Sequence, residues 1–220
     1  MISLPDFNKA FDYENGFYLT SHPSRLGKCI SHYELFRIAN ELPGDIVECG
    51  VFKGASLLRF ASFQEVFGKQ RRKVIGFDTF GAFPKTHFAS DKELRKEFID
   101  DAGAQSISRT QLLSVVKQKG LTTEVELVEG NVVQTVPAYV KANPNLKIAL
   151  LNLDTDIYEP AVVILEHLFP LIVKGGILIS DDYRVFPGET KAIDDFFQGK
   201  NVTIQNFPNL KTPHFIIKKN

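Results

Sequence analysis

Residues 45–54 read DIVECGVFKG, and this stretch decides the fold class of the chain. It begins as a short apolar strand, carries an acid at Glu48, and turns at Gly50 toward a helix that begins after Gly54. Glycines in such a turn let the backbone come close to a ligand. A second apolar strand is predicted over residues 73–78 and again ends on an acid. This order of strand, helix and strand predicts an α/β fold with a mostly parallel sheet.

The rest of the chain continues the alternation of strands and helices. Strands are predicted over residues 125–128, 147–153, 177–180, about 202–206 and about 213–218. Helices are predicted after Pro137, over about 159–172 and over about 189–198. The last two strands are close in sequence, so we expect them to be antiparallel. No repeat or linker interrupts the chain, and residues 1–220 are predicted to form one domain.

The N-terminal segment and a later insertion depart from this pattern. Residues 1–30 show no clean period, whereas Ser31 and Glu34 have the spacing of a capping box. Residues 1–42 are therefore expected to be an extension that packs on the domain, ending in a helix. Residues 79–120 are longer than a crossover between strands requires. This insertion is predicted to be a lid or substrate wall; an inserted pair of helices without a function is the alternative.

Capping boxes predict where the two helices of the lid insertion begin. Ser90 with Glu93 and Ser108 with Gln111 have the required spacing. The helices are expected over about residues 91–101 and about 109–119.

The charge and cysteine content exclude several classes of protein. Acidic and basic residues number 26 each. This balance argues against binding to nucleic acid or anionic membranes through an overall positive charge. The basic run at residues 69–73 is interpreted as a solvated turn. With two cysteines, no signal-peptide pattern and no apolar stretch near the roughly 18 residues of a membrane helix, we expect a cytoplasmic protein.

Acids follow four of the predicted strands. They are Glu48, Asp78, Asp154 and the pair Asp181 and Asp182. The carboxyl ends of parallel strands form the ligand-binding edge of an open α/β sheet, so these side chains should converge. Carboxylates so close repel one another, which calls for a positive charge among them. Oxygen ligands favour Mg²⁺ or Mn²⁺ over zinc. The sequence therefore predicts a metal site at Asp154, Asp181 and Asp182, with capping or ion pairing as the alternative.

Three parts of the sequence, namely the turn after the first strand, Asp78 and Asn131, suggest a nucleoside ligand that is not a dinucleotide. The spacing of Gly50 and Gly54 differs from the dinucleotide pattern, and Glu48 in the turn would repel a pyrophosphate but suit an ammonium or sulfonium group. Asp78 can accept hydrogen bonds from both ribose hydroxyls. Asn131 carries both a donor and an acceptor for an adenine edge. Each of these residues also has an ordinary interpretation, as a turn or cap residue.

The longer motifs resemble a known family. Residues 43–54, 76–80, 151–159, 175–183 and 187–192 are similar to the macrocin O-methyltransferase (TylF-like) family, and the resemblance covers residues 30–200. This family comprises metal-dependent class I S-adenosylmethionine methyltransferases that act on sugar hydroxyls of macrolide and aminocoumarin antibiotics. Two departures stand out: the pair at residues 81–82 replaces a turn that is often acidic in the family, and Asn131 stands where Asp is common.

The resemblance implies a fold and a set of residue roles. The fold is a Rossmann-like class I methyltransferase domain, a seven-stranded, mostly parallel sheet whose last strand is antiparallel. Glu48 and Gly50 would lie beside the methionine part of S-adenosylmethionine, and Asp78 would hold its ribose. The metal would be bound by Asp154, Asp181 and Asp182, and Asp156 would be the general base.

Together these features predict an S-adenosylmethionine-dependent O-methyltransferase. Mg²⁺ or Mn²⁺ would orient the hydroxyl of a sugar-containing small molecule, with Asp154 and Asp156 as catalytic residues. The expected partners are this acceptor and, as an open question, further copies of the chain, without nucleic acid or membrane. Two alternatives remain. Residues 154–156 have the D-x-D form of a metal-dependent glycosyltransferase, or the chain is a non-catalytic cofactor-binding paralogue.

Overall fold

The computed structural model describes residues 2–219 and contains a seven-stranded sheet in the order β3-β2-β1-β4-β5-β7-β6. The strands are β1 (Asp45–Cys49), β2 (Val74–Asp78), β3 (Val125–Glu129), β4 (Ile148–Leu153), β5 (Ile172–Ser180), β6 (Gln205–Asn206) and β7 (His214–Ile217). The first five strands pair in parallel, and β7 is antiparallel to both β5 and β6. The predicted seven-stranded, mostly parallel α/β fold is therefore confirmed.

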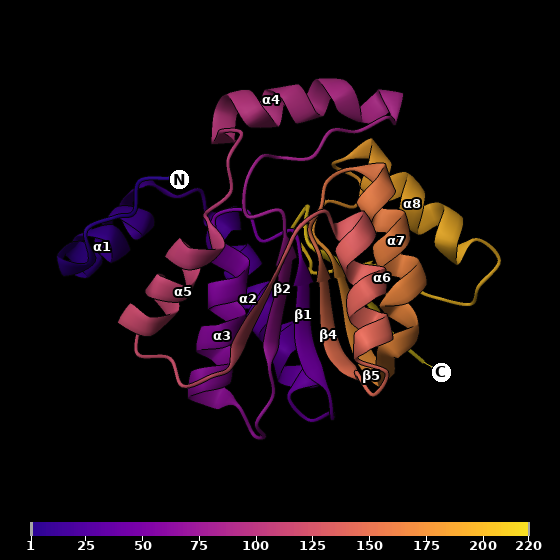
Figure 1. The fold of residues 1–220 in the computed structure, drawn as a ribbon, viewed down its shortest axis with the longest axis horizontal. Coiled ribbons are helices and arrows are strands. Elements are labelled where there is room, and N and C mark those ends of the chain that lie inside the picture. Colours follow the sequence, from indigo (N-terminus) through magenta and orange to yellow (C-terminus); the bar gives the residue numbers. More distant parts are fainter. Residues whose placement is uncertain (1, 220) are drawn as a thin grey trace.

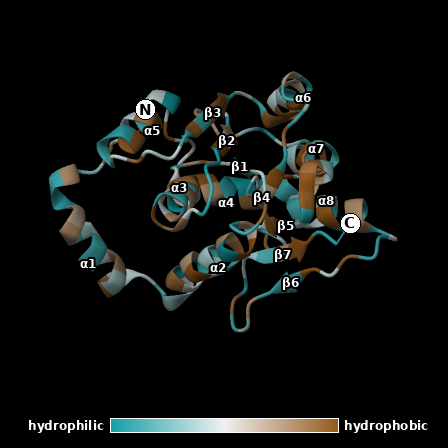
Figure 2. Ribbon diagram, turned by 90° about the horizontal axis from the view of Figure 1, so that it is seen from below, coloured by the Kyte–Doolittle hydropathy of each residue, from teal (hydrophilic) through white to brown (hydrophobic). Residues whose placement is uncertain are grey.

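Helices cover both faces of this sheet. They are α1 (Ala10–Thr20), α2 (Pro23–Ala39), α3 (Ala55–Phe67), α4 (Lys92–Ala102), α5 (Arg109–Gln118), α6 (Val132–Ala142), α7 (Tyr158–His167) and α8 (Pro187–Phe197). Figures 1 and 2 show α2, α3 and α5 on one face and α6, α7 and α8 on the other. In Figure 1, α4 lies across the carboxyl ends of the strands, whereas α1 projects away from the sheet.

The apolar strand residues divide between two cores. Neighbouring residues of a strand point to opposite faces. Ile46 accordingly packs with α2, α3 and α5, while Val47 packs with α6, α7 and α8. Both side chains are fully buried. Burial on both faces explains why these strands read as continuous apolar runs and why the sequence predicts them well.

The N-terminal segment differs from the prediction. Helix α2 begins at Pro23 with His22 as its N-cap, so the capping box predicted at Ser31 and Glu34 is wrong. Proline fits the first turn of a helix, where its missing N–H is not needed. Ser31 lies within the helix and donates its hydroxyl hydrogen bond to the carbonyl of Gly27 at 2.9 Å. The segment before α2 is also largely helical, and α1 has no buried residue.

The predicted starts of a helix and a strand are displaced as well. Helix α6 begins at Val132, capped by Asn131, and contains Pro137 instead of following it. Strand β5 begins at Ile172, before the predicted residue 177. In the insertion, the capping box of Ser108 and Gln111 is confirmed.

The other capping box of the insertion is not formed. Helix α4 begins at Lys92 after a short 3₁₀ turn and has no side-chain cap, so the prediction at Ser90 and Glu93 is wrong. Within residues 2–219, no helix combines the length and the apolar character needed to cross a membrane.

Candidate functional site

A cavity of about 770 Å³ lies at the carboxyl edge of the sheet. Its lining contains most of the predicted site residues, namely Gly50, Asp78, Asn131, Asp154, Asp156, Asp181 and Asp182. Of the predicted site residues, Glu48 and Gly54 are outside this lining. The insertion contributes Phe83 and Phe98 to the lining. Most of the predicted site residues thus converge on one cavity.

Three carboxylates form the part of this cavity best suited to a cation. One oxygen from each of Asp154, Asp156 and Asp182 lies within 4.8 Å of the others. The backbone N–H of Asp154 donates to the carbonyl of Cys49 at 2.9 Å, which holds the loop against β1. Asp156 adopts a left-handed conformation with φ of 64°, which turns the chain back toward the cluster.

The cluster is electrostatically unfavourable without a cation. Burial, and then the charge of Asp154, raises the pKa of Asp156 to about 8. Burial followed by the neighbouring carboxylates also raises the pKa values of Asp154 and Asp182 well above the ordinary range. A divalent cation bound there would offset the repulsion between the carboxylates, because it supplies positive charge among them.

Asp181 is placed differently from the other three aspartates. Its side chain is buried, and one carboxylate oxygen contacts the ammonium of Lys28 on α2. The other oxygen lies 3.6 Å from Nε2 of His32 and has no hydrogen-bond partner. Burial opposes ionisation of Asp181, but His32 and Lys28 outweigh it and hold the pKa below its usual value.

Glu189 joins the two loops that carry the acids, and its role is not evident from the sequence. The side chain is fully buried on the first turn of α8. One carboxylate oxygen accepts hydrogen bonds from the hydroxyl of Ser180 at 2.7 Å and the N–H of Asp182 at 3.1 Å. Its own N–H donates to the carbonyl of Asp156 at 3.3 Å. Glu189 therefore fixes the ends of β4 and β5 relative to each other.

Asp91, also missed by sequence reasoning, anchors the insertion to the same two loops. Its buried carboxylate accepts one hydrogen bond from the N–H of Tyr158 at 3.0 Å and another from the N–H of Gly188 at 2.7 Å. These groups lie at the N-termini of α7 and α8, where a negative charge is favourable. A Cβ at Gly188 would lie 2.0 Å from Asp91 Oδ2, so only glycine fits there.

A second contact holds the insertion from the side of α7. The carboxylate of Glu159 accepts hydrogen bonds from the N–H of His87 at 2.6 Å, the N–H of Phe88 at 3.2 Å and the hydroxyl of Thr86 at 3.0 Å. The insertion is thus attached to the helices that follow the acid-bearing loops.

The turn after β1 lies directly against the acid loop. A Cβ at Gly50 would lie 1.7 Å from the carbonyl oxygen of Asp154, so glycine is required. Asp78 accepts hydrogen bonds from the N–H groups of Val51 at 2.9 Å, Phe52 at 3.0 Å and Phe80 at 2.7 Å. The Asp78 carboxylate therefore holds the backbone of this turn in place, and it also lines the cavity.

Asn131 and Gly54 both lie at the start of a helix. Asn131 lines the cavity and caps α6, its side-chain oxygen accepting from the N–H of Val133 at 3.0 Å. Its side-chain amide group remains available as a donor. Gly54 precedes α3 with φ of 85° and is buried.

Glu48 lies inside the sheet, behind the turn. It is fully buried and accepts hydrogen bonds from Ser56 Oγ at 2.9 Å and Asn152 Nδ2 at 3.4 Å. Burial raises its pKa to about 8. Ser56, in contrast, lines the cavity.

This burial predicts how stability depends on pH. The folded protein keeps a proton on Glu48 between its ordinary pKa of 4.5 and about 8, where the unfolded chain has released it. The resulting stabilisation is present below pH 4.5 and is lost as the pH rises toward 8. In urea denaturation from about pH 5 to about pH 8, Glu48→Gln should gain stability relative to wild type as the pH rises. The same shift in Glu166→Gln, an exposed change on α7, would contradict this assignment.

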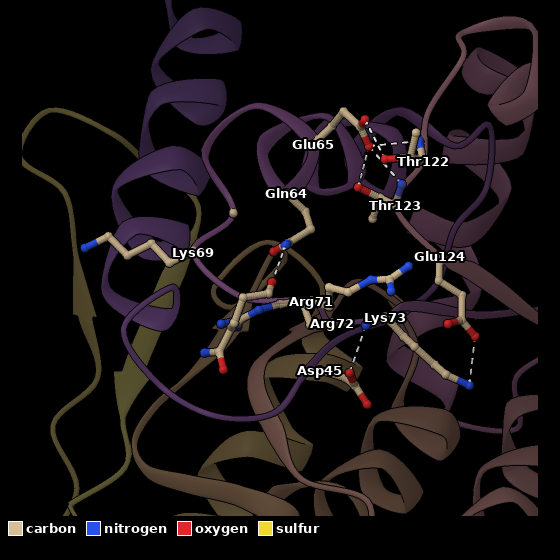
Figure 3. A pocket seen from close by; sticks show the side chains of 12 residues that line it. Asp45, Gln64, Glu65, Lys69, Arg71, Arg72, Lys73, Thr122, Thr123 and Glu124 are labelled. Carbon is tan, nitrogen blue, oxygen red and sulfur yellow. Dashed lines mark hydrogen bonds and ion pairs between the residues drawn. The ribbon is translucent and has the colours of Figure 1, made fainter.

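The basic run at residues 69–73 borders a separate crevice at the opposite edge of the sheet (Figure 3). Arg72 is buried and donates hydrogen bonds to backbone carbonyls at the end of α2 and just beyond it, including that of Ala39 at 3.2 Å. Lys73 pairs with Glu124 at 3.0 Å, and Lys69 pairs with Glu41. These basic residues thus serve helix capping and surface ion pairing.

Comparison with known proteins identifies the family. The sequence profile described as macrocin-O-methyltransferase (TylF) matches residues 25–207, most of the chain. The chain belongs to this family. The macrocin O-methyltransferase match includes the turn after β1, the insertion and both acid-bearing loops.

Individual relatives of this member of the macrocin O-methyltransferase family are also named as O-methyltransferases. The chain is 30% identical over 152 residues to 8-demethyl-8-(2,3-dimethoxy-alpha-L-rhamnosyl)-tetracenomycin-C 4′-O-methyltransferase of Streptomyces olivaceus, covering 67% of the chain and 56% of that protein. It is 26% identical to demethyldecarbamoylnovobiocin O-methyltransferase of Streptomyces niveus, with coverage of 72% and 60%. The chain therefore spans less than two thirds of the length of these curated relatives.

A solved structure is similar over nearly the whole chain. The apo structure of CalS11, described as a TDP-rhamnose 3′-O-methyltransferase of calicheamicin biosynthesis, superimposes with a TM-score of 0.69 at 27% identity. The alignment covers 98% of this chain and 87% of CalS11. The class I methyltransferase fold is thus common to this protein and a sugar O-methyltransferase.

Proposed function

We propose that this protein is an S-adenosylmethionine-dependent O-methyltransferase that acts on a hydroxyl of a sugar-containing small molecule. The observation that carries the proposal is the cluster of Asp154, Asp156 and Asp182 in the wall of a cavity that Gly50 also lines. Family membership supports the methyl-transfer chemistry. The relatives are named for methylation of sugar-bearing natural products or a nucleotide sugar, which supports a glycosidic acceptor.

The donor set of the cavity fits a hard divalent cation. All candidate ligands are carboxylate oxygens, the type that Mg²⁺ and Mn²⁺ prefer. Asp154 and Asp182 of the cluster would hold the cation together with Asp181, which lies beside the cluster and has a buried carboxylate oxygen without a hydrogen-bond partner among the described residues. When bound, the cation would supply positive charge that lowers the pKa of an acceptor hydroxyl nearby.

The remaining residues of the cavity have distinct tasks. Asp156 accepts the proton that leaves the acceptor hydroxyl, since its carboxylate belongs to the same cluster. The acceptor oxygen then attacks the methyl carbon of the donor substrate, the carbon–sulfur bond breaks, and its electron pair stays on sulfur as S-adenosylhomocysteine. Asp78 and Asn131 hold the ribose and adenine of the donor. The insertion, through Phe83 and Phe98, excludes water from the reacting atoms.

The deciding experiment uses S-adenosylmethionine labelled in its methyl group. The protein is incubated with Mg²⁺ and a panel of nucleotide sugars, glycosides and catechols, with and without a chelator. Labelled glycoside or nucleotide sugar formed only with the metal is the expected result. Binding of the donor without turnover on any acceptor would favour a non-catalytic paralogue, and transfer of a sugar from a nucleotide sugar would favour a glycosyltransferase.

A further inference from the structure

Lys28 is a cation built into the acid cluster from a distant part of the chain. It lies on α2, 153 residues before Asp181 in sequence, and its ammonium contacts the Asp181 carboxylate. The side chain is 22% exposed and lines the cavity. A lysine side chain is ordinarily protonated, so Lys28 places a positive charge against Asp181.

The other basic side chains near Asp181 do not substitute for Lys28. Nε2 of His32 lies 3.6 Å from the second carboxylate oxygen of Asp181, and neither atom has a hydrogen-bond partner within residues 2–219. Nδ1 of His32 lies 3.0 Å from the guanidinium of Arg59, so the ring is engaged on its other side. The direct contact of a basic side chain with Asp181 therefore comes from Lys28.

We propose that Lys28 is an internal counter-ion that occupies Asp181 in the metal-free protein and must release it before Asp181 can bind a divalent cation. The proposal rests on the proposed metal site. It follows from geometry: Asp154, Asp156 and Asp182 face one another, whereas Asp181 is turned to Lys28. Lys28 thus lowers the affinity for the metal and stabilises the protein without it. Release also leaves a free ammonium in the cavity, available to a polar acceptor.

The size of the effect follows from the bond that must break. A hydrogen bond between two charged groups in a buried setting corresponds to roughly a tenfold to hundredfold change in an equilibrium constant. Removing the Lys28 ammonium should therefore tighten metal binding by at least about tenfold.

The test is calorimetric titration of Mn²⁺ into the protein without methyl donor or acceptor. Lys28→Met is expected to bind Mn²⁺ at least about tenfold more tightly than wild type. The matched control is Arg25→Met, which removes an exposed positive charge from the same helix and the same cavity. Its affinity should stay within about twofold of wild type, because an exposed charge is screened. Equal tightening in both variants, or none in Lys28→Met, would overturn the proposal.

A double-mutant cycle separates direct competition from the general field of a cation. Asp181→Asn should weaken Mn²⁺ binding, and Lys28→Met should add no tightening in that background. Tightening that persists without Asp181 would show that Lys28 acts only through its field, against the proposal.

Thermal unfolding in a chelator gives a second readout that needs no activity. Lys28→Met should lower the Tm in EDTA and regain it with Mn²⁺. If that variant does not fold, Lys28→Arg keeps the charge and should bind Mn²⁺ no more tightly than wild type; tighter binding would overturn the proposal. Absence of Mn²⁺ binding in every variant would overturn the metal site and this proposal together. Tight binding with no difference between variants would overturn this proposal alone.

Discussion

Asp154→Asn is expected to reduce methyl transfer by about a thousandfold, because it removes a charge at the centre of the acid cluster. Asparagine keeps the shape of the side chain, and the loop remains tied by the backbone hydrogen bond from Asp154 to Cys49. The fold and the turn at Gly50 should therefore persist. Transfer is measured with labelled methyl donor, and donor affinity by calorimetry should change little.

A matched control tests whether the loss is local. Asp195 is an exposed aspartate on α8 that pairs with Lys191 at 2.8 Å. It is not among the residues that line the cavity. Asp195→Asn should retain wild-type transfer. If Asp154→Asn also retained it, or if chelation left the wild-type rate unchanged, the carboxylates would have no metal role.

Asp91→Ala is expected to lower the free energy of unfolding by about 2–5 kcal/mol. It leaves the N–H groups of Tyr158 and Gly188 buried without their acceptor, and each unsatisfied group costs about 1–3 kcal/mol. It also removes a negative charge from two helix N-termini. Because Asp91 anchors the insertion, α4 should detach more often, and trypsin should cleave faster at Lys92, Arg95 or Lys96. Urea denaturation and timed proteolysis measure the two effects.

The control for this change lies on the same helix. Asp100 is exposed on α4, so Asp100→Ala should change the free energy of unfolding by no more than about 0.5 kcal/mol. If Asp91→Ala had an equally small effect, the two hydrogen bonds would not anchor the insertion.

The strands and the acids at their ends could be predicted because both depend on local sequence. Val47 and Leu151 belong to continuous apolar runs that a buried parallel sheet requires. Asp78, Asp154 and Asp182 follow such runs directly, so their convergence is a property of the fold. The start of α2 was harder to predict, since Pro23 serves equally as a helix breaker and as a first-turn residue.

The contacts that organise the site could not be predicted, since they join distant segments. Asp91 meets Gly188 across 97 residues, and Lys28 meets Asp181 across 153. Neither Asp91 nor Lys28 belongs to a spacing that local chemistry would single out. Glu189 has a weaker signal, as an acid in the first turn of α8, but its hydrogen bonds to Ser180 and Asp182 depend on the sheet being assembled.

Because Gly50 lies against the Asp154 carbonyl, the distance between donor and acceptor and the selectivity for the acceptor would depend on different parts of the cavity. The segment that would cradle the methyl donor and the segment that would present the acceptor oxygen touch main chain to main chain. Their spacing is thus independent of any rotamer. Phe83 and Phe98 line the same cavity but take no part in this main-chain contact, so substitutions there are expected to reshape the cavity without changing that spacing. Such an arrangement lets acceptor selectivity diversify while the reaction distance stays constant.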